Sequence, residues 1–343
     1  MRRGKSPASA GHAGQLTRRA AAGAIASAGL IAATGLTLGS AIQAPPASAA
    51  IKNGNYDLVP RQVADGVWFV EGAREYFTQD NGGDIVNCVL IETDAGMVII
   101  DTGVSLKYGQ ALRQAAASLS GLGIAASFNT HHHPDHWFGN QVFADRPIYA
   151  LGETASLARA EGDGFSDGMY RLLGNWMRGT ETTPPTQTIT SSSITIGGRI
   201  FVLYPLSGHT GADLALLDKK TGTLITGDLA FYERAPTTPH ADLPKWYEAL
   251  DALAAVEAAL IIPGHGPEDR DGQSLEQTRT YLTWLETGLK QAAAEGLDMV
   301  EIMEETLLPD AFKNLGAMPQ EFHRSVSHLY PAIERQAMPL SNL

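Results

Sequence analysis

The sequence predicts an α/β fold in which two halves, each made of strands and helices, stack as a four-layer αβ/βα sandwich. Short runs rich in Val, Ile and aromatic residues fall into two blocks along the chain, which is typical of strands. Apolar residues at helical spacing interleave with each block and follow it. With 343 residues, 44% of them hydrophobic, the chain can bury the core of one large domain.

The first half is predicted to hold four strands with helices between and after them. The strands are runs of β-branched and aromatic residues: Gly66–Glu71, Ile85–Glu92, Met97–Ile100 and Ile124–Asn129. Apolar residues at helical spacing predict helices over Leu106–Leu119 and Glu153–Glu161. The Thr/Ser/Pro-rich segment Thr180–Ser193 indicates a loop that leads to the second half.

The second half repeats this order and ends in helices. Its predicted strands are Arg199–Leu206, Ala212–Leu217, Thr223–Thr226 and Leu260–Ile262. Helical patterns cover Leu243–Ala258 and most of the chain from Ser274 onward, including Met299–Leu307, Ala311–Leu315 and Glu321–Arg335. We therefore expect one domain over residues 50–343, with a helical C-terminal part from about residue 274.

Residues 1–49 are predicted to be a signal peptide. A basic N-terminal stretch precedes an apolar run of small residues, and Ala47-Ser48-Ala49 is typical of a cleavage site. The pair Arg18-Arg19 resembles a twin-arginine export signal, with the general secretory route and a retained membrane helix as alternatives. We expect a bacterial protein that is periplasmic or secreted and does not contact the membrane after cleavage.

Charge and cysteine content exclude several classes of protein. The formal net charge is −12, and cleavage after Ala49 removes five basic and no acidic residues, which makes it −17. Such an acidic chain is a poor candidate for binding nucleic acid. The single cysteine, Cys88, excludes an intrachain disulfide and a cysteine-rich zinc finger. Any metal site must therefore use histidines and carboxylates.

The segment after the fourth strand carries four ligand-type side chains within six residues: His131, His133, Asp135 and His136. An extended chain points residues i and i+2 to the same side, so His131 and His133 can share one metal. The turn stiffened by Pro134 can aim Asp135 and His136 at a second position. By the same alternation His132 points away from these ligands. The alternative is a solvated histidine-rich loop.

Three further candidates each follow a strand and have glycine beside them: His209, Asp228 and His265. Site residues of α/β folds gather at strand ends and in the loops beyond them. Each of the three alone is more typical of a loop or capping residue. Together with the histidine-rich segment, and in this order, they indicate one metal centre.

The set HxHxDH, SGHT, TGD and PGHG resembles the metallo-β-lactamase superfamily from Val63 to Gly266. The resemblance implies an αββα four-layer sandwich with extra C-terminal helices and a dinuclear centre between its halves. It also implies that metal one is bound by His131, His133 and His209. Metal two would be bound by Asp135, His136 and His265, and Asp228 would bridge the two metals. Asp101 matches an early Asp turn that supports the ligand loop.

One departure bears on the branch of that superfamily. True metallo-β-lactamases generally have no Asp at the bridging position, whereas Asp228 stands there as in the glyoxalase II-like hydrolases. Cys88 matches no ligand position. The stretch from Gly227 to Asp242 is similar to quinoprotein relay system zinc metallohydrolases of type 1, which are related to exported Sox-type hydrolases. Arg234 and His240 in this stretch are candidate substrate contacts.

These residues predict an exported hydrolase with two Zn²⁺ ions, although the ligand types also tolerate Fe or Mn. A metal-bridging hydroxide would attack an ester, thioester, lactone or related bond of a small molecule, with Asp135 and Asp228 as catalytic residues. Hydrolysis of β-lactam amides is one alternative. An iron-containing oxidoreductase, and a non-catalytic accessory of a quinoprotein dehydrogenase system that uses PQQ, are two others.

Overall fold

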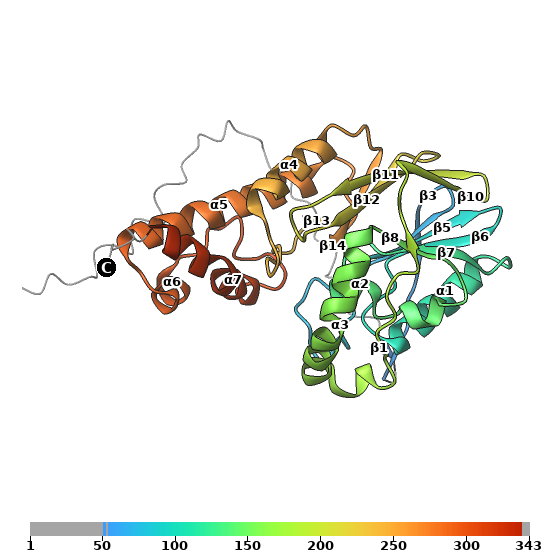
Figure 1. Ribbon diagram of the computed structural model, residues 1–343, viewed down its shortest axis with the longest axis horizontal. Helices are drawn as coiled ribbons and strands as arrows, with labels where there is room; N and C mark the ends of the chain where they lie inside the picture. The colour runs from blue at the N-terminus through green and yellow to red at the C-terminus, as the bar shows by residue number, and fades with distance from the viewer. Residues whose placement is uncertain (1–50, 53, 338–343) are drawn as a thin grey trace, which may run out of the picture.

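Two β-sheets lie face to face with helices on their outer faces, as Figure 1 shows. This computed structural model describes residues 51–52 and 54–337, so the signal peptide expected over residues 1–49 lies outside the described residues. The expected αββα sandwich is confirmed. The chain first builds one sheet and its helices, and then builds the other.

The first sheet has seven strands in sequential order, antiparallel from β3 to β6 and parallel from β6 to β9. Its strands are β3 (Arg61–Ala64), β4 (Val67–Val70), β5 (Cys88–Thr93), β6 (Gly96–Ile100), β7 (Ile124–Phe128), β8 (Ile148–Ala150) and β9 (Gln187–Thr188). The short pair β1 (Ile51–Lys52) and β2 (Asn55–Tyr56) forms a separate ribbon. The edge strand β9 lies inside the segment that the sequence indicates as a loop.

The second sheet has five strands in sequential order, and only its last pair is parallel among the described residues. Its strands are β10 (Ser193–Ile196), β11 (Arg199–Leu206), β12 (Asp213–Asp218), β13 (Thr223–Phe231) and β14 (Leu260–His265). The expectation that the third of its predicted strands ends at Thr226 is wrong. β13 continues because Leu229 and Phe231 are buried against the helices behind it.

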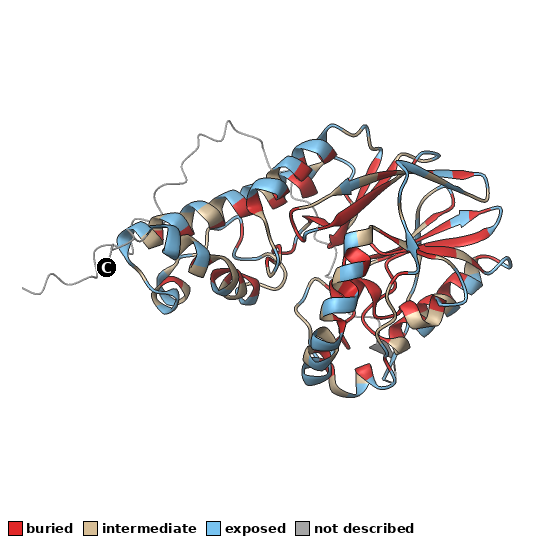
Figure 2. Ribbon diagram, viewed as in Figure 1, coloured by how far each residue is buried: buried red, intermediate tan, exposed pale blue. Residues whose placement is uncertain are grey.

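Three apolar layers hold the sandwich together. Phe69, Ile91 and Ile100 of the first sheet meet Leu203 and Ile262 of the second in the middle layer. A second layer joins the outer face of the first sheet to α1 (Leu106–Leu119) and α3 (Gly152–Leu173). The third joins the second sheet to α4 (Leu243–Ala254) and the helices that follow. The red ribbon segments in Figure 2 mark these layers.

The helices differ from the sequence prediction in three main places, of which one is the helix expected over 243–258, which ends at Ala254. α1 has the predicted bounds, and its N-cap Ser105 accepts a hydrogen bond from the amide of Tyr108. The helix expected over 153–161 extends to Leu173, since Met169 and Leu173 are buried in the second layer. The five residues 311–315 form turns instead of the expected helix, because so short a segment gains few helical hydrogen bonds.

The C-terminal helices form an arm that extends from the sandwich, on the left in Figure 1. They are α5 (Gln273–Glu295), α6 (Met299–Glu305) and α7 (Gln320–Ala337). Tyr281, Leu285 and Phe322 belong to the buried cluster that continues from the second sheet into the arm. The arm is therefore an extension of the third layer.

Three short helices lie in the first half of the sandwich. α2 (Pro134–Trp137) and the 3-10 helix η2 (Asn140–Phe143) come between β7 and β8, and a second 3-10 helix, η3 (Gly174–Met177), follows α3.

A buried ion pair joins the arm to the sandwich. The guanidinium of Arg234 lies 3.5 Å from the carboxylate of Glu321 in α7, and both side chains are 2% exposed. The hydroxyl of Thr238 donates to Ser325 of the same helix. These contacts link the segment after β13 to α7.

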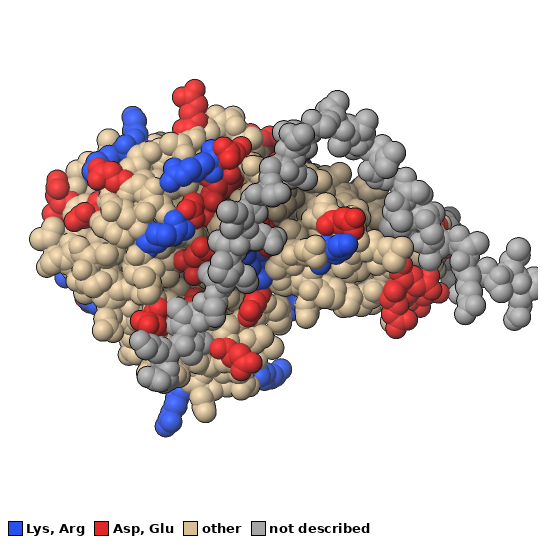
Figure 3. All heavy atoms as spheres, turned by 180° about the vertical axis from the view of Figure 1, so that it is seen from behind, with Lys and Arg blue, Asp and Glu red and all other residues tan. Residues whose placement is uncertain are grey.

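No helix among the described residues is long and apolar enough to cross a membrane. On the face shown in Figure 3, basic side chains are scattered among acidic ones and form no continuous patch.

We predict that Glu321→Ala destabilises the protein by about 3–5 kcal/mol, because it leaves the charge of Arg234 buried without a partner. Urea unfolding measures this change in the free energy of unfolding. Lys313→Ala, which removes half of an exposed pair with Asp310, should change the free energy by less than about 0.5 kcal/mol. Equal effects of the two substitutions would contradict the assignment of a buried ion pair at this joint.

Candidate metal centre

The seven candidate ligands meet at one edge of the sandwich, where strands of both sheets end. His131 and His133 lie in the loop after β7, and Asp135 and His136 lie in α2. From the second sheet come His209 in the β11–β12 loop, Asp228 inside β13 and His265 at the end of β14. All seven side chains are at most 7% exposed. The fold thus brings together residues that are up to 134 positions apart in the sequence.

Asp228 lies between the two sets of imidazoles because β13 is irregular at this point. The register of β13 against β14 shifts on both sides of Gly227. The neighbouring strand must also come very close, since a Cβ on Gly264 would lie 2.0 Å from Oδ1 of Asp228. Any residue larger than glycine at position 264 would therefore clash with the buried carboxylate of Asp228.

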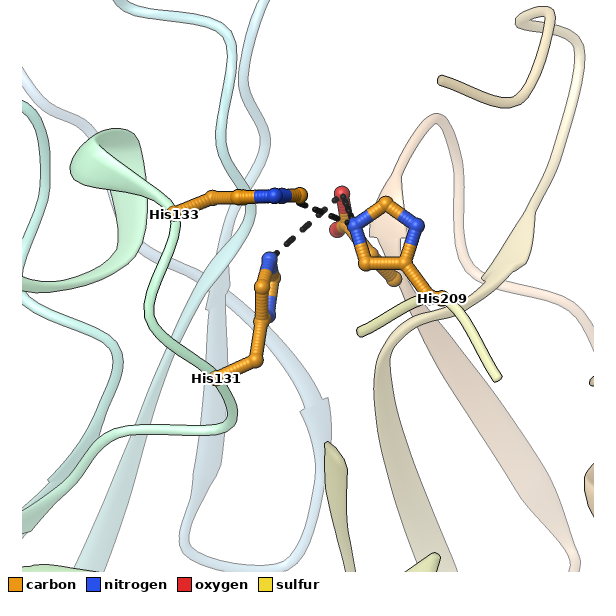
Figure 4. A group of neighbouring side chains, drawn as sticks. His131, His133 and His209 are labelled. Carbon is orange, nitrogen blue, oxygen red and sulfur yellow. Dashed lines mark hydrogen bonds and ion pairs between the residues drawn. The ribbon is translucent and has the colours of Figure 1, made fainter. Parts of the chain in front are cut away.

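The first group of side chains surrounds Oδ2 of Asp228. Nε2 of His209 lies 3.3 Å from this oxygen, and Nε2 of His131 lies 3.9 Å from it. Nδ1 of His133 is 2.9 Å from Nε2 of His209, so the three rings converge, as Figure 4 shows. One ligand atom from each of the four residues lies within 4.8 Å of the others. This group matches the set expected for metal one plus the bridge.

The second group lies on the other side of Asp228. Nε2 of His136 is 3.2 Å from Oδ1 of Asp228, and Nε2 of His265 is 3.3 Å from Oδ2. Oδ2 of Asp135 is 3.4 Å from His265 Nε2 and 3.6 Å from His136 Nε2. The carboxylate of Asp228 thus contacts both groups, which is the geometry expected of a bridge.

The separations between these atoms fit zinc. In a tetrahedral site with zinc–ligand distances of about 2.0–2.1 Å, neighbouring ligand atoms are about 3.3 Å apart. Three of the four imidazole nitrogens near Asp228 lie 3.2–3.3 Å from its carboxylate oxygens, and that of His131 lies 3.9 Å away. Among the described residues, Nε2 of His131, Nε2 of His136 and Oδ1 of Asp228 are buried without a hydrogen-bond partner. Buried polar atoms normally have partners, and a cation would supply them here.

Protein groups hold the outer nitrogen of several ligand imidazoles. Oδ2 of Asp101 lies 2.7 Å from Nδ1 of His136, and the main-chain carbonyl of Ile85 lies 2.7 Å from Nδ1 of His265. Such contacts fix the ring orientation and leave Nε2 free for a metal. Asp101 also accepts hydrogen bonds from the amide and hydroxyl of Thr130, and it has a φ of 59°, which is unusual for a residue other than glycine. These contacts explain how the turn at Asp101 supports the loop that carries the ligands.

Asp213 supports the centre, although no motif in the sequence indicates it. Its carboxylate accepts hydrogen bonds from the amide and the hydroxyl of Thr210, which fixes the loop that carries His209. Burial raises the pKa of Asp213 to about 7. Asn87 acts similarly on the other side, because its amide donates to the carbonyls of Pro263 and Gly266 around His265. The contacts of Asn87 join segments more than 170 residues apart and have no local sequence signal, whereas Asp213 and Thr210 are only three residues apart.

The pKa values of most of these groups favour the protonation state that can bind a cation. Burial lowers the pKa values of His131 and His133 well below the ordinary histidine value and that of His209 to about 3. Burial raises the pKa of Asp228, but nearby histidines outweigh it and hold the value well below normal. For His136, burial lowers the pKa, but the carboxylates, led by Asp228, raise it well above normal. A metal must therefore displace a proton from His136.

The two candidate substrate contacts have different surroundings. Arg234 is 1% exposed, and its hydrogen bonds go to Glu321 and to the main-chain carbonyls of Glu75 and Ala235. Its side chain therefore anchors the arm rather than reaching toward substrate. His240 is 34% exposed at the side chain, and its Nδ1 lies 2.9 Å from Nε2 of His133. His240 thus borders the centre.

We predict that the metal-free protein loses stability in acid partly through His209. The pKa of His209 falls from about 6.5 in the unfolded chain to about 3 in the folded chain, so only the unfolded chain takes up its proton between these values. Between pH 6 and pH 4, with a chelator present, the free energy of unfolding of the wild type should fall about 1 kcal/mol per pH unit more steeply than that of His209→Gln. Parallel slopes would contradict the buried, neutral state of His209.

Known proteins share this fold and parts of this sequence. A linear primary-alkylsulfatase from Pseudomonas sp. is 23% identical over 283 residues, which are 70% of this chain and 53% of the alkylsulfatase. The chain thus matches about half the length of that relative. An uncharacterized protein, YobT, from Bacillus subtilis is 26% identical over 57% of this chain and 91% of its own length.

Solved structures support the fold. A metallo-beta-lactamase from Pontibacter korlensis superposes with a TM-score of 0.54 at 23% identity, over 66% of this chain and 99% of that protein. The mono-zinc form of the metallo-beta-lactamase FIM-1 from Pseudomonas aeruginosa also has a TM-score of 0.54, at 20% identity, over 68% of this chain and 97% of that protein. The family model of the metallo-beta-lactamase superfamily matches residues 81–265, more than half of the chain and all seven candidate ligands. The chain therefore belongs to the metallo-beta-lactamase superfamily.

Proposed function

We propose that this protein is a dinuclear zinc hydrolase that cleaves an ester-type bond in a small molecule: a carboxylic ester, thioester, lactone or sulfate ester. The observation that carries the proposal is the position of Asp228. Its carboxylate lies 3.2–3.3 Å from imidazole nitrogens of both groups, which suits a ligand shared by two cations. Nitrogen and oxygen ligands without a thiolate suit zinc.

Zinc supplies Lewis-acid chemistry when bound, because it makes water nucleophilic near pH 7 and polarises an oxygen of the substrate. The residues of the chain provide the geometry. The carboxylate of Asp228 would be shared by two metal ions, one held by each group of ligands. Asp135 borders the second position, where its carboxylate can orient a water molecule and accept its proton. Asp101 and Ile85 keep the rings of His136 and His265 in place.

Substrate must approach from the side of His133 and Asp135. These two ligands are 6% and 5% exposed, whereas the other five are 2% exposed or less. The partly exposed side chains of His240 and Glu161 lie next to His133 on this side. Exclusion of water elsewhere strengthens the electrostatic interactions within the centre.

The alkylsulfatase relative adds sulfate esters to the classes of ester that the sequence suggests. β-Lactam amides are the second candidate, since the solved structures of similar fold include metallo-beta-lactamases. Asp228 at the bridging position favours the ester-type classes.

We predict that the purified protein binds two zinc ions and hydrolyses at least one compound in a screen of carboxylic esters, thioesters, lactones, sulfate esters and β-lactams. Asp135→Asn should lower kcat on that compound by about 10²–10⁴-fold, since it removes a proton acceptor. Asp163→Asn, an exposed carboxylate on α3, serves as the control and should leave kcat unchanged. Full activity of a zinc-loaded Asp135→Asn or Asp228→Ala protein would contradict the proposal.

Metal analysis and a PQQ-binding assay separate the remaining alternatives. Iron together with a visible chromophore would favour an oxidoreductase on the same fold. Tight binding of PQQ without turnover would favour an accessory of a quinoprotein dehydrogenase. The similarity of residues 227–242 to quinoprotein-associated hydrolases is the support for that link.

We also propose that the protein is exported and works in the periplasm or outside the cell, on the basis of residues 1–49. N-terminal sequencing of the mature protein from the producing bacterium tests this proposal. Cleavage after Ala49 predicts Ala50 as the first residue. A mature chain that still begins within the first 40 residues would contradict it.

A further inference from the structure

Two side chains outside the seven ligands continue the centre toward the surface. Nε2 of His133 lies 2.9 Å from Nδ1 of His240, and Nε2 of His240 lies 3.4 Å from Oε2 of Glu161. His240 comes from the segment between β13 and α4, whereas Glu161 comes from α3. We call this arrangement the His133–His240–Glu161 chain. It joins the two halves of the sandwich across the side from which substrate approaches.

The positions of the ring protons along this chain follow from the role of His133. Its Nδ1 faces the first group, so in the neutral imidazole that binds a metal the ring proton must be on Nε2. This N–H donates to Nδ1 of His240. The proton of a neutral His240 is then on Nε2, which points at the carboxylate of Glu161. Because Nε2 of His240 is a donor in this arrangement, it cannot also hold a third cation.

His132 lies beside the same carboxylate on a second side. Its side chain is 1% exposed, and its Nε2 lies 3.4 Å from Oε2 of Glu161. The ring of Phe165 packs against His132, His133 and His240. The carboxylate of Glu161, whose side chain is 35% exposed, thus lies within 3.4 Å of two imidazole nitrogens.

We propose that His240 and Glu161 are positioning residues that set the affinity of the first metal position through His133. The negative charge of Glu161, passed on through His240, makes His133 a stronger ligand and fixes its ring orientation. Outer partners of metal-bound histidines typically change metal affinity by about 10–100-fold. The proposal rests on the proposed function, since it requires that the first group binds zinc.

Zinc affinity at each position can be measured separately. The background variant His265→Ala loses a ligand of the second group and keeps the first group, whereas His131→Ala does the opposite. Titration of each metal-free protein with zinc, in competition with a chromophoric chelator, gives the dissociation constant of the remaining position. The readout is binding and does not depend on knowing the substrate.

We predict that His240→Ala raises the dissociation constant about 10–100-fold in the His265→Ala background and less than about twofold in the His131→Ala background. His240→Asn should recover part of the loss, because its amide oxygen can accept the hydrogen bond from His133, but it lacks the nitrogen that faces Glu161 and should bind zinc about as weakly as Glu161→Ala. Glu161→Ala, a change on the helix surface that leaves the fold intact, should raise the constant about tenfold. Asp163→Asn is the matched control on the same helix and should change nothing.

Two outcomes would overturn the positioning role. One is an unchanged dissociation constant at the first position in both His240→Ala and Glu161→Ala. The other is an equal loss at both positions, which would indicate a general structural effect. A wild-type protein that binds no zinc would instead contradict the proposed function, and the positioning role would fail with it.

Discussion

The buried carboxylate of Asp228 is the constraint on which the rest of the structure depends. It is 2% exposed and has imidazole nitrogens of both groups within 3.3 Å. A charge taken out of water this completely is stable only when other charges or hydrogen bonds compensate it. The histidines do so through the proton on His136 when no metal is present, and two cations would do so in the loaded protein.

This requirement explains features that are otherwise unrelated. The irregular register of β13, the glycine at position 264 and the strained backbone of Asp101 all serve to bring side chains from two sheets to one point. The imidazoles of His133, His136 and His265 follow a common pattern, in which one nitrogen faces the metal centre and the other has a protein partner. The His133–His240–Glu161 chain is the one that reaches the surface.

The local features of this protein are predictable from its sequence, and the long-range ones are not. Spacing of two residues identifies His131 and His133, and apolar periodicity gives the bounds of α1. The support from Asn87, the contact of His240 with His133 and the burial of Arg234 against Glu321 each depend on segments that meet only after folding. The extra length of β13 likewise follows from helices that pack behind it.

The central claim is that two cations lie on either side of Asp228, and a crystal structure of the zinc-loaded protein tests it most directly. Anomalous diffraction data collected at the zinc absorption edge locate each ion independently of the protein density. The account predicts two peaks per chain, one among His131, His133 and His209 and the other among Asp135, His136 and His265, with Asp228 between them. Ions at other places, or a fully loaded protein with a single ion, would contradict it.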